Sequence, residues 1–426
     1  MTFERNGMMM SQWRVLAVLV LAISNVQADN WPQWRGPSNN GISDAKNVSV
    51  EWSESKNIAW KVELPDRSGA TPCVWGDRIF LTTPDGDDLY LMAISTSGKV
   101  VWKKKVTTGN RGRSEGNGAS PSPCTDGKHV WVFFGNGIMA CYDFDGNEVW
   151  KTDIQERYGK FRYGFGQHTT PVLWGDHLYL QLIHSKQAWV VALDKMTGKE
   201  VWRHDRKSDG VAECYHSYAT PSVWSNGKSA YLVTHGNDYA IGHSLYDGSE
   251  IWRLGDLNPK DRYNRTLRFV ASPVVTPELI VVPSAKNGPV VGVKPNAKGY
   301  IDRNKTTHVQ WRMDRGTTDV PSPVVHDGLV YMCRENGILY CLDAATGEEV
   351  YRESTHRSKH RASPVYADGK IYLVSASGFF SVVKAGRAFE LLAQNKLDGS
   401  FYSSPVIVGN RIYLRGSDAL YAIENK

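Results

Sequence analysis

The amino-acid sequence predicts an all-β protein, an eight-bladed β-propeller of four-stranded antiparallel blades, and three observations carry this prediction. Eight Ser-Pro or Thr-Pro pairs recur 41 to 52 residues apart, a period that is typical of propellers and solenoids. Six Trp-Lys or Trp-Arg pairs recur in step with them. Between these two markers lie short β-branched and aromatic runs bounded by Gly, Asp and Asn, which indicate strands joined by hairpins.

The Ser-Pro and Thr-Pro pairs open the first strand of each repeat. Their prolines are Pro72, Pro123, Pro171, Pro221, Pro273, Pro323, Pro364 and Pro405. In the third repeat, strand-like runs at residues 178–182 and 189–193 follow the proline, and a turn at 194–198 leads into the run that contains Trp202. Four strands in each of eight repeats predict a propeller that closes on itself.

The tryptophans mark the outermost strand of each blade. We expect Trp60, Trp102, Trp150, Trp202, Trp252 and Trp311 to be structural residues that pack against a neighbouring blade. Tyr351 is a weaker seventh copy, and the eighth is lost in the segment 389–392.

The order of the two markers predicts how the ring closes. The first marker tryptophan precedes the first proline, and only three strands follow the last proline. Residues 57–64 should therefore complete the last blade by pairing with residues 419–423, which would remove an open sheet edge. The uninterrupted repeat predicts one propeller domain over residues 57–426, preceded by an N-terminal extension over residues 29–56.

The first 28 residues have the pattern of an export signal. Arg14 precedes an apolar run at 15–23, and Val26-Gln27-Ala28 has small residues where a signal peptidase cleaves. We expect cleavage near Ala28 and a periplasmic or secreted protein. The apolar run is too short to cross a bilayer comfortably and no later one is longer, so we expect no membrane span. Because the residue directly after the cleavage point is not a Cys, we expect no lipid anchor.

Two motifs resemble a known family. Residues 192–202, with the pattern Ala-x-Asp-x-x-Thr-Gly-x-x-x-Trp, resemble the tryptophan-docking motif of pyrroloquinoline-quinone (PQQ) type propellers, and residues 341–351 are a degenerate copy. The opening Trp-Pro-Gln-Trp-Arg-Gly-Pro at 31–37 resembles the leader of secreted bacterial PQQ-like repeat proteins. The resemblance covers nearly all of the mature chain. It implies the propeller fold, and its motif residues carry no information about catalysis.

The resemblance implies two kinds of function. Quinoprotein dehydrogenases hold PQQ with calcium and oxidise alcohols or sugars, but this chain has no adjacent cysteine pair of the kind many of them carry. The outer-membrane barrel-assembly scaffold propeller is similar in size, is not catalytic and binds other proteins. We therefore expect a non-catalytic exported binding or scaffold protein without a cofactor. A PQQ-dependent oxidoreductase with calcium is the alternative, and a polysaccharide-active enzyme is the second alternative.

The loops before the prolines are the candidate site. In a propeller these loops surround one end of the central channel, which we call the mouth. Their aromatic, basic and acidic side chains suit a protein or glycan ligand. The candidate ligand-binding residues are Arg67, Asn117, Gln167, His168, His216, Tyr218, Arg268, Asp319, His360, Arg361 and Tyr402. The alternative is that these side chains pair with one another and plug the channel, since loops favour polar residues in any case.

Other motifs do not indicate a site. His356 and His360 have metal-ligand spacing but lie in a predicted loop among basic residues, so we expect no metal. The basic run at 103–105 fits the solvated edge of an outer strand better than a nucleic-acid surface. We expect the six cysteines to be buried free thiols and the protein to be a monomer.

Overall fold

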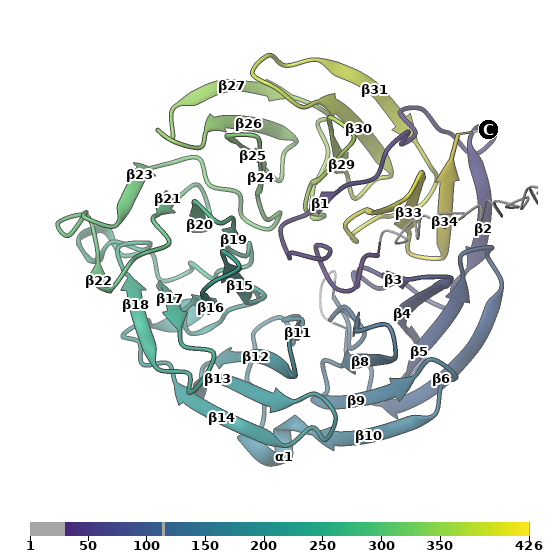
Figure 1. The fold of residues 1–426 in the computed structure, drawn as a ribbon, viewed down its shortest axis with the longest axis horizontal. Helices are drawn as coiled ribbons and strands as arrows, with labels where there is room; N and C mark the ends of the chain where they lie inside the picture. Colours follow the sequence, from purple (N-terminus) through teal and green to yellow (C-terminus); the bar gives the residue numbers. More distant parts are fainter. Residues whose placement is uncertain (1–29, 113–115, 426) are drawn as a thin grey trace, which may run out of the picture.

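The computed structural model describes residues 30–112 and 116–425, and the predicted signal peptide lies outside them. Eight antiparallel sheets surround a central axis, and Figure 1 shows them as a closed ring. The predicted eight-bladed β-propeller is confirmed. No helix in the described ranges combines the length and apolar character needed to cross a membrane.

The first four blades follow the chain in order, each from its innermost to its outermost strand. They are β3 (Cys73–Trp75), β4 (Arg78–Asp85), β5 (Asp88–Ser95) and β6 (Val100–Thr108); β7 (Cys124–Thr125), β8 (His129–Phe133), β9 (Ile138–Asp143) and β10 (Glu148–Asp153); β11 (Val172–Trp174), β12 (His177–His184), β13 (Gln187–Asp194) and β14 (Glu200–Asp205); and β15 (Ser222–Ser225), β16 (Ala230–Gly236), β17 (Tyr239–His243) and β18 (Glu250–Leu254). Each first strand is short and begins with a buried residue, because it lines the crowded centre of the ring.

The last four blades repeat the pattern. They are β19 (Val274–Val275), β20 (Ile280–Pro283), β21 (Val290–Val293) and β23 (Val309–Met313); β24 (Val324–His326), β25 (Leu329–Cys333), β26 (Ile338–Asp343) and β27 (Glu349–Ser354); β28 (Val365–Ala367), β29 (Lys370–Val374), β30 (Phe379–Lys384) and β31 (Leu391–Lys396); and β32 (Val406–Val408), β33 (Arg411–Arg415), β34 (Ala419–Glu424) and β2 (Ile58–Glu63). The described helices are short: α1 (Ile154–Tyr158), η1 (Ala212–Tyr215) and η2 (Lys260–Arg262).

The N-terminal strand closes the ring as the sequence predicts. β2 pairs antiparallel with β34, with Ile58 opposite Ile423 and Glu63 opposite Ala419. The backbone N–H of Glu424 also donates to the Asn57 carbonyl at 2.9 Å. Figure 1 shows β2 as the outermost strand beside the C-terminus.

Two blades carry a short extra strand that the repeat does not predict. β1 (Ile42–Ser43) pairs parallel with β28, at the inner edge of the seventh blade. β22 (Gly299–Ile301) pairs parallel with β18, at the outer edge of the fourth. Both extra strands come from segments outside the four-strand repeat, namely the N-terminal extension and the long connection between β21 and β23.

Each marker tryptophan lies at the same register of the fourth strand of its blade. The indole Nε1 of Trp202 donates to the Leu245 carbonyl of the next blade at 2.9 Å. The turn beneath it needs Gly248, which has a φ of +76° and where a Cβ would lie 2.6 Å from the indole. Four other indoles make the equivalent bond: Trp60 to Thr96, Trp102 to Phe144, Trp150 to Lys195 and Trp311 to Ala344.

The remaining positions of this register depart from the pattern. The Trp252 ring is fully buried, but its Nε1 has no hydrogen-bond partner in the described chain. In the seventh blade the structure places Ala393 opposite Val382, at the register of the missing tryptophan. All six cysteines are free and buried, and burial raises the pKa of the Cys333 thiol to about 12.

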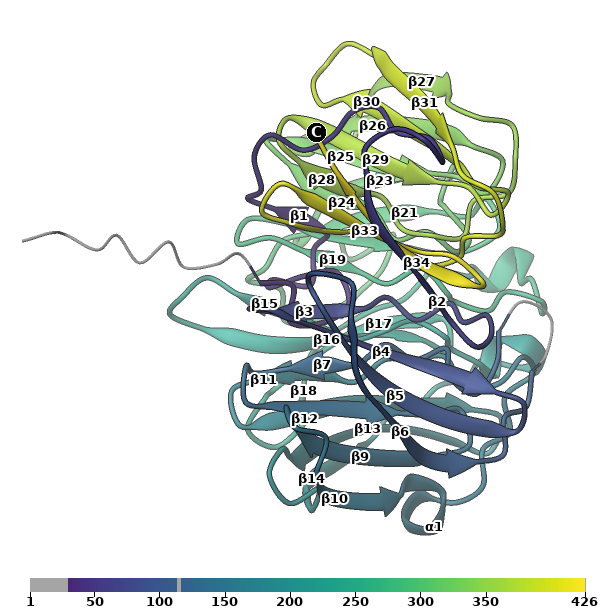
Figure 2. The ribbon, with the colours of Figure 1, turned by 90° about the vertical axis from the view of Figure 1, so that its right-hand side faces the viewer.

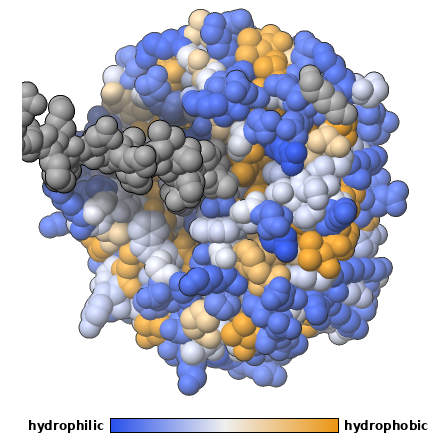
Figure 3. Space-filling model, turned by 45° about the vertical axis from the view of Figure 1, so that its right-hand side comes forward, coloured by the Kyte–Doolittle hydropathy of each residue, from blue (hydrophilic) through white to orange (hydrophobic). Residues whose placement is uncertain are grey.

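The surface shows no single large apolar area on the face drawn in Figure 3. Hydrophilic residues cover most of it, and apolar residues appear in separate small groups. Among the described residues, the exposed large apolar side chains come from several blades, for example Val100, Trp174 and Tyr300. Isolated exposed apolar residues of this kind are ordinary.

Candidate functional site

A ring of hydroxyl groups surrounds the channel. The Ser or Thr before seven of the eight repeat prolines accepts a hydrogen bond from the backbone N–H of its counterpart in the preceding blade. Seven such bonds are present: Thr71 to Ser122 (2.9 Å), Ser122 to Thr170 (3.0 Å), Thr170 to Thr220 (3.2 Å), Thr220 to Ser272 (2.8 Å), Ser272 to Ser322 (2.9 Å), Ser322 to Ser363 (2.9 Å) and Ser363 to Ser404 (3.0 Å). The recurrent Ser-Pro and Thr-Pro pairs therefore have a structural cause, because each hydroxyl links two blades.

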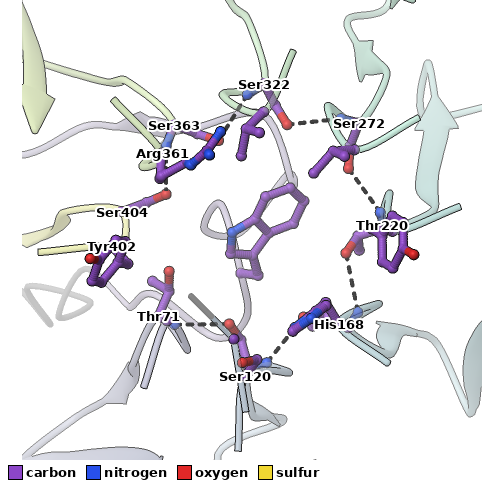
Figure 4. A pocket seen from close by; sticks show the side chains of 18 of the residues that line it. Thr71, Ser120, His168, Thr220, Ser272, Ser322, Arg361, Ser363, Tyr402 and Ser404 are labelled. Carbon is purple, nitrogen blue, oxygen red and sulfur yellow. Dashed lines mark hydrogen bonds between the residues drawn. The ribbon is translucent and has the colours of Figure 1, made fainter. Parts of the chain in front are cut away.

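A cavity of about 270 Å³ lies at the centre of this ring. Its wall includes the residues of the hydroxyl ring: Thr71, Ser122, Thr170, Thr220, Ser272, Ser322, Ser363 and Ser404. Figure 4 shows several of them arranged in a ring and joined by their hydrogen bonds, with an indole side chain in the middle of the view. We call this space the axial cavity.

Five of the predicted site residues meet at the axial cavity: His168, Tyr218, Arg268, Arg361 and Tyr402. They come from the loops of five different blades. Phe165, from the same loop as His168, joins three of them. Its carbonyl lies 2.7 Å from His168 Nε2, its N–H donates to the Tyr218 hydroxyl at 3.2 Å, and its ring lies 4.7 Å below the Arg268 guanidinium.

The two arginines at the cavity wall are held by carboxylates that do not line it. Arg268 pairs with Glu213 at 3.4 Å, and Arg361 pairs with Glu335. A guanidinium group has five N–H donors in a fixed plane, and in each arginine a carboxylate helps to orient that plane. Burial lowers the pKa of His168, so this imidazole is neutral near pH 7.

Two other predicted residues border a neighbouring cavity of about 530 Å³, which shares Phe165 and His168 with the first. Gln167 is 1% exposed, and neither atom of its side-chain amide has a hydrogen-bond partner. Asn117 is buried and ties two loops together, because its Nδ2 donates to the Arg67 carbonyl at 2.6 Å.

The structure does not bring the remaining predicted residues to the axial cavity. The side chain of Arg67 is exposed. His360 is buried, with Nδ1 2.8 Å from the Ser358 carbonyl. Asp319 accepts a hydrogen bond of 3.2 Å from the Lys286 N–H. His216 packs between Tyr163 and Tyr218. The contacts of His360, Asp319 and His216 are local.

Sequence reasoning missed the part of the site that the N-terminal extension supplies. Residues 31–43 contact the innermost strands of several blades, two residues after each proline. Trp31 exchanges two backbone bonds of 2.8 Å with Val74, and further bonds join Thr125 to Pro32, Leu173 to Gln33, Tyr366 to Gly41 and Ser43 to Ile407.

This segment therefore lies across the end of the channel opposite the mouth. Trp34, which belongs to it, lines the axial cavity. Figure 2 shows the segment that carries β1 towards one face of the ring. The aromatic motif at 31–37 was the available signal, but a motif without a repeat partner does not reveal which strands it contacts.

The described residues do not fit calcium-bound PQQ. Calcium takes oxygen ligands, mainly carboxylates, and no Asp or Glu is among the described residues that line the axial cavity. In the same described ranges, no group of three or more His, Cys, Asp or Glu side chains is placed to hold a metal ion.

Comparison with known proteins gives two kinds of relative. The family model described as outer membrane protein assembly factor BamB matches residues 42–157, 135–298 and 297–388. The chain is 25% identical over 238 residues to the outer membrane protein assembly factor BamB of Yersinia pestis, covering 54% of this chain and 55% of that protein. It is 24% identical over 224 residues to the polyvinylalcohol dehydrogenase of Sphingopyxis sp. (strain 113P3), covering 49% of this chain and 33% of that protein. The alignments thus span about half of one relative and a third of the other.

Solved structures share the fold at low sequence identity. BamB from Moraxella catarrhalis superposes with a TM-score of 0.62 at 13% identity, covering 87% of this chain and 97% of that one. A europium-containing methanol dehydrogenase gives 0.69 at 11% identity, covering 93% of this chain and 98% of that one. At these identities the likeness establishes the propeller fold alone.

Proposed function

The chain belongs to the family described as outer membrane protein assembly factor BamB, and we propose that it is a non-catalytic exported binding propeller that engages a protein partner in the cell envelope. The observation that carries the proposal is the axial cavity, where side chains from five blades meet at the mouth while the N-terminal segment lies across the other end. The predicted signal peptide supports the envelope location.

The lining of the cavity supports binding rather than chemistry. Phe165, Tyr218 and Tyr402 offer aromatic surface, and Arg268 and Arg361 offer fixed donors. A few oriented polar groups among aromatic side chains are typical of a recognition site. Among the described lining residues, the one group that titrates near neutral pH in its free form is His168, and burial lowers its pKa, so a proton relay at this place has little support.

Site-specific photo-crosslinking tests the proposal. A photoreactive phenylalanine analogue in place of Tyr402, at the cavity, should crosslink an envelope protein in living cells. The same analogue in place of Tyr246, which is 90% exposed in the turn between β17 and β18, is the control. The crosslink at position 402 should disappear in an Arg268→Ala background whose melting temperature is nearly unchanged. Equal crosslinking from both positions, or no effect of the Arg268 change, would contradict binding at the mouth.

The dehydrogenase-like relative gives the alternative function its support, and a direct assay separates the two. The purified protein incubated with PQQ and calcium should show no dye-linked oxidation of alcohols or sugars, because the described cavity wall offers no carboxylate for the metal. Robust oxidation would replace the binding proposal with a quinoprotein activity. Hydrolysis of a polysaccharide panel would instead favour the second alternative.

A further inference from the structure

We propose that the axial cavity receives one aromatic side chain of the partner polypeptide, and that it favours tyrosine over phenylalanine. The proposal rests on the proposed function and names the residue type that anchors the partner at the same site. Three features carry it: the indole of Trp34 at the cavity, the rigid segment that holds this indole, and the aromatic and hydroxyl groups of the wall.

Trp34 supplies an aromatic surface near the axis of the propeller. It lines the axial cavity together with the eight residues of the hydroxyl ring, and it is the one tryptophan among the described lining residues. Figure 4 shows an indole side chain in the middle of that ring. Trp34 is half-buried, and its indole makes no hydrogen bond to the described chain. The part of the ring that faces the cavity is therefore available to pack against a ligand.

The segment that carries Trp34 is fixed on both sides of it. Before it, residues 31–33 bond to the innermost strands of the first three blades through Trp31 with Val74 (2.8 Å), Pro32 with Thr125 (2.8 Å) and Gln33 with Leu173 (3.0 Å).

After Trp34, the buried guanidinium of Arg35 donates to the carbonyls of Ser322 and Pro323 in the sixth blade. Arg35 is not among the residues that line the cavity, and its contribution is to hold the segment in place. An aromatic ring on a segment that is already ordered offers packing surface at little further cost in conformational entropy.

Rings from three mouth loops face the same space. Phe165, Tyr218 and Tyr402 line the cavity, and Val270 and Val320 add apolar surface. The rings of Phe165 and Tyr218 meet edge to face, with centroids 6.2 Å apart and an interplanar angle of 68°. Aromatic rings attract one another in such tilted or offset arrangements, and aromatic anchors in desolvated pockets carry much of the binding energy of protein interfaces. The wall therefore suits an aromatic side chain.

The hydroxyl ring favours an aromatic side chain that carries an oxygen. A Ser or Thr hydroxyl has one O–H donor as well as its acceptor lone pairs. Seven of the eight ring hydroxyls accept a backbone N–H from the preceding blade. Within the described chain none of the eight donates a hydrogen bond, so their O–H groups can serve an acceptor on the ligand. The phenolic oxygen of tyrosine is such an acceptor, and phenylalanine has none.

The size of the cavity favours a single side chain. At about 270 Å³ it lies at or below the lower end of the range for pockets that enclose whole small-molecule ligands, roughly 300–1,000 Å³. One aromatic side chain that packs against Trp34 and the rings of the wall would occupy much of this space.

Ligand-observed NMR titration of the full mature protein tests the proposal, since this measurement detects weak binding of short peptides. Three capped pentapeptides carry tyrosine, phenylalanine or leucine between glycines. Methyl β-glucoside represents a glycan ligand, and PQQ without calcium represents the quinoprotein alternative. Each probe is titrated into the wild type, Trp34→Leu, Trp34→Phe and the control Trp174→Leu, whose indole is 37% exposed and is not among the residues that line the axial cavity.

We expect the tyrosine peptide to bind most tightly, the phenylalanine peptide less tightly, and the leucine peptide about tenfold more weakly than the tyrosine peptide. Trp34→Leu should weaken the tyrosine peptide about tenfold and leave the leucine peptide nearly unchanged, because only an aromatic ligand loses a ring partner. Trp34→Phe should keep most of the affinity, and Trp174→Leu all of it. If its melting curve shows that Trp34→Leu does not fold, Tyr402→Leu removes another ring of the wall and should discriminate between the peptides in the same way.

The other outcomes overturn different statements. Equal binding of the tyrosine and leucine peptides, or an equal loss of both in Trp34→Leu, would overturn the aromatic anchor and leave protein binding in place. Equal binding of the tyrosine and phenylalanine peptides would overturn the part given to the hydroxyl ring. Trp34-dependent binding of the glucoside or of PQQ, with no peptide bound, would overturn the polypeptide ligand and with it the proposed function. Failure of every probe to bind would overturn the proposal, and photo-crosslinking at position 402 would still test the proposed function by itself.

Discussion

The Ser272 hydroxyl accepts a hydrogen bond of 2.8 Å from the backbone N–H of Thr220, and both residues line the axial cavity. The bond joins the fifth blade to the fourth beside the axial cavity. The same contact recurs around the axis, so the residues that couple neighbouring blades are also the wall of the candidate site. Stability and binding can still be tested separately, because the loop arginines do not take part in this ring.

Loss of one ring hydroxyl should lower stability. Ser272→Ala leaves the buried Thr220 N–H without its acceptor, and an unsatisfied buried donor costs about 1–3 kcal/mol. The free energy of unfolding from urea titration measures it. Ser272→Thr, which keeps the hydroxyl and matches the residue at the equivalent position 220, is the control. Equal stability of the alanine variant and the wild type would show that the hydrogen bond contributes nothing.

The docking tryptophans should matter more than exposed ones. Trp202→Ala removes a buried ring and its bond to Leu245, and truncation of a buried aromatic residue costs about 3–5 kcal/mol. Trp174→Ala, at a ring that is 37% exposed, should cost much less. A loss under about 1 kcal/mol for Trp202→Ala, in chemical denaturation, would refute the docking interpretation.

Stability should fall in acid because of buried histidines. Burial lowers the pKa of His235 and of His243 to about 3, below the value of about 6.5 in an unfolded chain. Above pH 6.5 these imidazoles are neutral in both the folded and the unfolded state, so they do not change the free energy of unfolding. As the pH falls from about 6.5 towards 3, the unfolded state takes up protons first. Each histidine therefore lowers the free energy of unfolding by about 3 kcal/mol between pH 7 and pH 4.

The variant His235→Leu isolates this effect. It removes one titrating group, so its free energy of unfolding should decline less steeply between pH 7 and pH 4 than that of the wild type. Parallel curves for the two proteins would show that His235 does not titrate differently in the two states.

Truncation should separate two roles of the N-terminal extension. A mature chain that starts at residue 44 keeps β2 and should fold, with a lower melting temperature because residues 31–43 no longer bridge the blades. A chain that starts at residue 65 also lacks β2 and leaves the edge of β34 open, so light scattering should report aggregation. Unchanged solubility and melting of the shorter chain would contradict the closure by β2.

The sequence predicted the ring because its signals were periodic. Eight prolines and six tryptophans define the register, and that register places residues 57–64 on the last blade, where β2 pairs with β34. The parallel strands β1 and β22 escaped prediction, because neither segment belongs to the repeat. The N-terminal motif was visible, yet the contact between Trp31 and Val74 joins residues 43 positions apart through the fold alone.

The site was predictable only as a set of loops. Position in the repeat told us which end of the channel each loop borders, and His168, Tyr218, Arg268, Arg361 and Tyr402 do line one cavity. The direction of each side chain depends on local bonds that no pattern reveals. His360 turns inward to the Ser358 carbonyl, and Asn117 reaches back to that of Arg67.

The bonds of the hydroxyl ring all point the same way: each blade donates to the one that follows it in the chain. The array is therefore homodromic, with a sense of rotation around the axis. Its one interruption among the described residues falls between the last blade and the first, where Ser403 Oγ lies 3.4 Å from Thr71 Oγ1 in place of the regular bond. At that junction a single buried side chain takes the place of the regular contact: Arg415 of the last blade donates to the Ala70 and Thr82 carbonyls of the first, while β2 closes the rim.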